Sequence, residues 1–142
     1  MGKIKYLALS LIAVGCFYYW ARAASSTFQR REFMNIEVAE KKWGSKKFFP
    51  EKFKTGDASL RASMVVDLIR SKYFIGKPLK KVRTQLGKSK GYFENDGIEA
   101  YLITPSPEKR GSKKEMWQII FLPDNEWKKV DEVKIHKNCC YN

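Results

Sequence analysis

The spacing of apolar residues between positions 57 and 87 predicts two helices. In the first, the apolar residues recur at helical intervals and give one broad apolar face: Leu60, Met64, Val65, Leu68 and Ile69. Asp57 stands before this stretch as a good N-cap, because its carboxylate can accept hydrogen bonds from first-turn amides. A second, shorter helix is expected with Pro78 at its first position, where no amide proton is needed, and with Leu79, Val82 and Leu86 on its inner face. Gly87 is placed to end it in a left-handed conformation.

After Gly91 the pattern changes to the alternation that is typical of strands. Tyr92 and Phe93 are expected to begin a strand, and residues 99–104, 116–122 and 130–137 predict three stronger ones. The polar stretch 108–115 is expected to be a loop. Because the helices precede the strands, residues 56–142 are expected to form an α+β domain, with two short helices packed on one face of a three- to four-stranded antiparallel sheet.

The amino-terminal residues 1–24 form a different kind of segment. Lys3 and Lys5 precede fifteen residues, 6–20, that carry no formal charge. A short basic flank followed by an apolar run is typical of an export signal or a membrane anchor, and a cytosolic core helix is the remaining alternative. The sequence therefore predicts a domain that lies outside the cytoplasm, in the periplasm or beyond, and that is tethered to or exported across a membrane.

Three fates of this segment stay open. The small residues around Ala23 suit cleavage by a signal peptidase. Residues 12–16 look like a bacterial lipobox, in which Cys16 would be the lipidation site. The aromatic run 17–20 favours an uncleaved anchor, because amphipathic rings suit the membrane interface.

Residues 25–55 are expected to form a basic and aromatic tether with some helix, because their apolar stripe is thin. Rings and cations interleave in the second half of this tether, a composition that suits contact with a protein or with anionic lipid. The candidate interface consists of Trp43, Lys46, Lys47, Phe48, Phe49, Lys52, Phe53 and Lys54. The alternative is that these rings simply pack onto the domain.

The composition adds a strong positive charge. The 142 residues contain 28 Lys and Arg against 15 Asp and Glu, a formal net charge of +13. Such a surface attracts anionic partners. Nucleic-acid binding is the alternative function that this charge favours, but an export segment would separate the domain from most nucleic acid, so no nucleic acid is expected.

Candidate catalytic groups are sparse. The only histidine is His136, no serine or aspartate pattern surrounds it, and no glycine-rich phosphate loop is present. We therefore expect no enzymatic activity, no cofactor and no small-molecule substrate. His136, Cys139 and Cys140 are the one group with metal-binding or redox potential, but three ligands are fewer than a closed zinc site requires, and the two cysteines can instead pair with each other.

Residues 61–136 also carry a family pattern. Its elements are 64–69, then Ile75-Gly76-Lys77, Leu86-Gly87, Tyr101, 117–121 with Pro123-Asp124, and Lys129-Val130. This pattern resembles the small SmpA/OmlA-type lipoproteins of the outer-membrane β-barrel assembly machine, whose fold is shared with β-lactamase inhibitor proteins. The resemblance implies an exported, non-catalytic module of helices on a sheet that docks onto a protein partner in the cell envelope.

Overall fold

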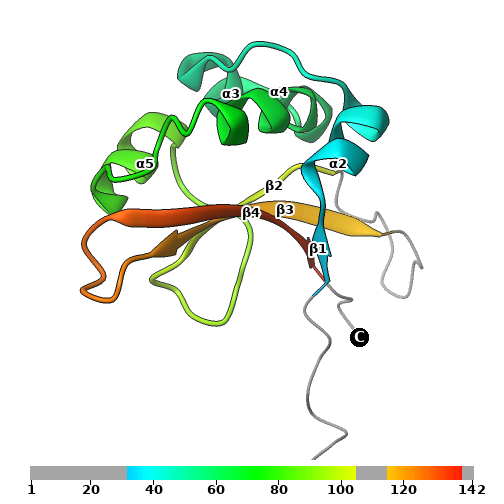
Figure 1. Ribbon diagram of the computed structural model, residues 1–142. Helices are drawn as coiled ribbons and strands as arrows, with labels where there is room; N and C mark the ends of the chain where they lie inside the picture. Colours follow the sequence, from blue (N-terminus) through cyan, green and yellow to red (C-terminus); the bar gives the residue numbers. More distant parts are fainter. Residues whose placement is uncertain (1–31, 105–114, 139–142) are drawn as a thin grey trace, which may run out of the picture. The chain divides into compact units, whose positions relative to one another are not determined.

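The computed structural model describes residues 32–104 and 115–138, which form four helices and one antiparallel sheet (Figure 1). In chain order the elements are β1 (Phe33–Met34), α2 (Ile36–Trp43), α3 (Pro50–Thr55), α4 (Ala58–Arg70), α5 (Leu79–Leu86), β2 (Glu99–Leu102), β3 (Met116–Pro123) and β4 (Val130–Asn138). The order of strands in the sheet is β1-β4-β3-β2. The predicted α+β class is confirmed, while the expected export helix lies outside the described residues.

The two helices predicted from hydrophobic spacing are present as α4 and α5. The side chain of Asp57 caps α4 by accepting a hydrogen bond of 2.8 Å from the Leu60 amide. At the end of α5, Gly87 has φ of +82° and ψ of −165°, a conformation that is almost restricted to glycine. The local sequence signals were therefore sufficient to predict these two helices.

The tether expected over residues 25–55 differs from the structure wherever that segment is described. The compact unit begins at Glu32, and its first residues form β1, α2 and α3. Strand β1 pairs with the end of β4, where Phe33 lies opposite His136. Some helix was expected here, but the packing of this segment into the domain was missed. α2 buries only Ala39 and α3 has six residues, so tertiary contacts hold these helices rather than an apolar stripe of their own.

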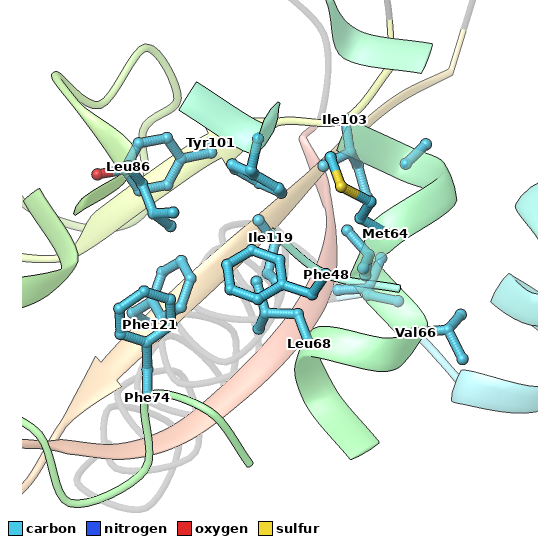
Figure 2. Close-up of a cluster of buried hydrophobic side chains, with 14 of the residues drawn as sticks. Phe48, Met64, Val66, Leu68, Phe74, Leu86, Tyr101, Ile103, Ile119 and Phe121 are labelled. Carbon is cyan, nitrogen blue, oxygen red and sulfur yellow. The ribbon is translucent and has the colours of Figure 1, made fainter. Parts of the chain in front are cut away.

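The main core fills the space between the helices and the sheet (Figure 2). Its aromatic rings meet edge to face: Phe74 and Phe121 have centroids 5.3 Å apart, and those of Phe53 and Tyr101 are 6.0 Å apart. Such T-shaped pairs contribute about 0.5–1.5 kcal/mol beyond their buried area. Phe53 belongs to the segment expected to be a tether, so α3 is joined directly to the sheet.

The loop between α5 and β2 covers the face of the sheet opposite the helices (Figure 1). In it, Phe93 and Ile98 form a second buried cluster with Ala100 and Ile120. The prediction that a strand starts at Tyr92 and Phe93 is therefore wrong. The chain turns back instead, because the fully buried side chain of Gln118 binds both backbone polar groups of Tyr92. Its amide nitrogen donates to the Tyr92 carbonyl at 2.7 Å, and its oxygen accepts from the Tyr92 N–H at 3.2 Å.

Candidate functional site

A basic cleft lies beside the edge strand β2, where the helices meet the loop that covers the opposite sheet face. Its volume is about 510 Å³. The end of α3 contributes Lys54, the end of α5 contributes Arg83 and Thr84, and the loop contributes Lys88, Tyr92 and Asn95 among others. The cleft therefore combines Lys54 with residues of the continuous stretch 83–98, which lies about thirty residues further along the chain.

The cleft is organised around a buried carboxylate. Glu99, in β2, is 5% exposed, and its Oε1 lies 2.7 Å from Nη2 of Arg83. A buried carboxylate needs such a partner, because an isolated charge is strongly destabilised away from water. The Arg83 side chain is 60% exposed beyond this contact. The pair thus fixes an arginine in the wall of the cleft while part of its guanidinium stays accessible.

Tyr101 supports the same wall from inside the core. Its hydroxyl donates a hydrogen bond of 2.9 Å to the carbonyl of Gly87 and lies 3.3 Å from Glu99 Oε2. Burial and the neighbouring carboxylate both raise the pKa of Tyr101 far above its ordinary value. The phenol therefore stays protonated and acts as a structural donor that positions Gly87 at the cleft.

The other two cations of the cleft are better placed for binding than for structure. Lys54 and Lys88 are exposed and form no ion pair within the part of the chain that the structure describes. The nearby Ser89 hydroxyl is occupied, because it exchanges hydrogen bonds with the carbonyl and the amide of Ala100. The arrangement offers a fixed guanidinium and two exposed ammonium groups against one exposed carboxylate, that of Asp96, so the excess of positive charge suits the binding of a carboxylate or another anion.

The structure buries some of the predicted interface residues and exposes others. Phe48 and Phe53 are buried in the core, 7% and 0% exposed, so they are not available to a partner. Phe49 is 42% exposed, and the ammonium groups of Lys47 and Lys52 lie 5.7 and 4.9 Å from its ring centroid. Two of the eight predicted interface residues therefore belong to the core, and the exposed ring of Phe49 lies at the start of α3.

The remaining members of that set lie elsewhere. Trp43 and Lys46 line a second cleft of about 490 Å³ next to the start of α4. Trp43 also contacts Trp117 of β3, with ring centroids 6.4 Å apart. Lys54 is the only predicted interface residue in the wall of the basic cleft.

Of the predicted metal-binding and lipidation residues, His136 alone lies within the part of the chain that the structure describes. Cys16, Cys139 and Cys140 lie outside the described residues. His136 is described: its Nδ1 lies 3.2 Å from the amide nitrogen of Gln118, and its ring centroid is 4.7 Å from that of Phe93. Strand β4, which carries His136, is an inner strand of the sheet, between β1 and β3. Over residues 32–104 and 115–138, no three His, Cys, Asp or Glu side chains cluster in a way that could hold a metal ion.

Sequence reasoning missed Arg83, Lys88 and Glu99 as site residues. One signal was present: Glu99 opens an otherwise apolar strand segment, and a carboxylate there needs a buried partner. The spacing between Arg83 and Glu99 gave no indication that they meet, since the loop joining them first crosses to the other sheet face.

Among the helices that the structure describes, none is long and apolar enough to cross a membrane. No family model, curated protein or solved structure matched the chain.

Proposed function

We propose that the chain is a non-catalytic cell-envelope protein, tethered to or exported across a membrane by residues 1–24, whose folded domain binds an acidic segment of a protein partner in the basic cleft. The cleft carries this proposal, because Arg83, Lys54 and Lys88 surround one hollow. The uncharged run 6–20 supports the envelope location. The resemblance of residues 61–136 to SmpA/OmlA-type lipoproteins supports a role in envelope assembly.

An acidic peptide fits the chemistry of the walls. Buried Glu99 holds the guanidinium of Arg83, so part of the entropic cost of binding has been met during folding. The ring of Tyr92, which is 55% exposed, and the backbone at Gly87 and Gly91 offer apolar and close-approach surface beside the cations. A peptide carboxylate can pair with the guanidinium of Arg83, while the peptide segment that follows it lies against the ring of Tyr92 and the glycine backbone.

The test uses the full chain in detergent micelles and a fluorescein-labelled glutamate-rich peptide, with binding followed by fluorescence anisotropy. Lys54→Gln with Lys88→Gln removes two exposed cations from the cleft. Lys80→Gln with Lys81→Gln is the matched control, because both lysines are exposed on α5, outside the cleft, and the change in net charge is the same. We expect the cleft variant to bind about 5- to 30-fold more weakly, as expected for a loss of about 1–2 kcal/mol.

Equal weakening in both variants would mean that only net charge matters and would reject the cleft as the site. Stronger binding of a single-stranded oligonucleotide than of the peptide, with the same dependence on Lys54 and Lys88, would point to nucleic acid instead. The envelope location is tested separately by cell fractionation and the mass of the amino terminus, which distinguishes a retained anchor, cleavage near Ala23 and acylation at Cys16.

A further inference from the structure

The charges of the described residues are divided unequally between the two sides of the domain. The helical layer, defined as residues 36–87, carries 13 Lys and Arg but only five Asp and Glu. The other described residues, which form the sheet and the loop over its opposite face, carry six Lys and Arg and nine Asp and Glu. The positive field therefore extends mainly from the helices, which lie together on one face of the sheet (Figure 1).

Apolar groups are exposed on the same layer. Val38, Phe49 and Ile75 are 52%, 42% and 39% exposed. Phe49 has two lysine ammonium groups near its ring, and Lys77 places its ammonium group 3.6 Å from the ring centroid of Tyr73. The layer thus presents rings with cations beside them as well as scattered charge.

Two segments of this surface lie next to each other. The buried ring of Phe48 contacts Tyr73, with centroids 5.0 Å apart, and Phe74, with centroids 6.1 Å apart. This contact joins the start of α3 to the turn after α4. We call the exposed and half-buried residues of these two segments the ring–lysine patch: Lys47, Phe49, Lys52 and Ile75, which are exposed, with Tyr73 and Lys77, which are half-buried.

We infer that the helical layer lies against an anionic lipid bilayer, with the ring–lysine patch at the level of the headgroups. Apart from Lys54 and Arg83, which line the basic cleft, the layer's cations are spread over four helices and the segments between them, so they are complementary to an extended anionic surface. Aromatic rings accompanied by lysines suit the boundary between headgroups and acyl chains, where one end of a side chain is apolar and the other is hydrated. An acidic protein would satisfy the same charges, and the experiment below distinguishes it from lipid.

This orientation is independent of the proposed partner in the cleft. It concerns the outer surface of the helices, and it can hold whether or not a peptide binds beside β2. The loop over the other sheet face, and the acidic residues of the strands, would then be directed away from the lipid.

The experiment incorporates the full chain into nanodiscs made of phosphatidylcholine alone or of phosphatidylcholine with phosphatidylglycerol. Accessible lysines are labelled with an amine-reactive reagent and quantified by mass spectrometry. We expect Lys47, Lys52 and Lys77 to be labelled at least about threefold less in the anionic discs, with the difference falling as salt is added. Lys134 is the internal reference, because it is paired with Ile120 on the opposite face of the sheet.

Two matched variants sharpen the test. Lys52→Gln removes a cation 4.9 Å from the exposed ring of Phe49, and Lys134→Gln removes one 5.1 Å from the ring of Phe33. Protection of Lys77 in anionic discs should decrease in the first variant and persist in the second. Equal labelling in both kinds of disc, or protection of Lys134 in place of Lys77, would overturn the inference. Protection that appears only after an acidic peptide or an oligonucleotide is added would assign the layer to a macromolecular partner instead.

Discussion

Replacing Phe53 by alanine tests whether residues 48–55 belong to the folded core or to a tether. Phe53 is 0% exposed, and its ring centroid lies 5.9 Å from that of Phe48 and 6.0 Å from that of Tyr101. Phe→Ala changes in cores cost about 3–5 kcal/mol, since the apolar contacts are lost and a cavity remains. The edge-to-face contacts with two other rings place this site toward the upper part of that range.

For a domain of this size, each kcal/mol lowers the midpoint of thermal unfolding by about 4 °C or more, so we expect a decrease of about 12 °C or more. The measurement is thermal unfolding of the full chain, followed by near-UV circular dichroism. Phe49→Ala is the control, because Phe49 lies four residues away and is 42% exposed; its cost should stay within about 1 kcal/mol. If both variants unfold at the same temperature as the unmodified chain, Phe53 is not a core residue and the packing of α3 described above is incorrect.

Three further changes probe other features. Arg83→Gln leaves the buried carboxylate of Glu99 without its partner and should destabilise the fold by up to about 3 kcal/mol in urea unfolding, whereas adding Glu99→Gln should recover part of the loss. Gly44→Ala should cost about 1–3 kcal/mol from backbone strain alone, measured in the same way, because Gly44 has φ of +81° and an added Cβ would meet nothing within 4 Å. The Arg70 guanidinium lowers the pKa of Glu40 below its ordinary 4.5. The stabilisation from this exposed pair should therefore be complete above pH 4.5 and be lost as the pH falls through the lowered pKa. Urea unfolding at pH 2 to 6 checks this, with Glu40→Gln as the comparison.

The parts of the fold that the sequence predicted are those whose signals are local. α4 has a capping aspartate and a continuous apolar face, and β3 and β4 have runs long enough to identify as strands. Each of these signals can be interpreted without knowing where the chain goes next.

The parts that were missed depend on contacts between distant residues. β1 consists of two residues and exists through its pairing with Ile135 and His136 of β4. Phe93 looked like the beginning of a strand because it follows another aromatic residue, but the buried amide of Gln118 turns that segment across the sheet. The cleft was missed for the same reason, since Arg83 and Glu99 meet only after this loop is in place.

The loop over the outer sheet face has a further consequence for the solubility of the chain. Residues 116–121 of β3 are all buried and uncharged, and their sequence, Met-Trp-Gln-Ile-Ile-Phe, has the high β-propensity of segments that form intermolecular sheets. Glu115 and Pro123 flank this run in the positions where natural sequences place residues that oppose self-association. Substitutions that release the loop, such as changes at Gln118, should therefore be recognised first by precipitation of the protein rather than by altered binding.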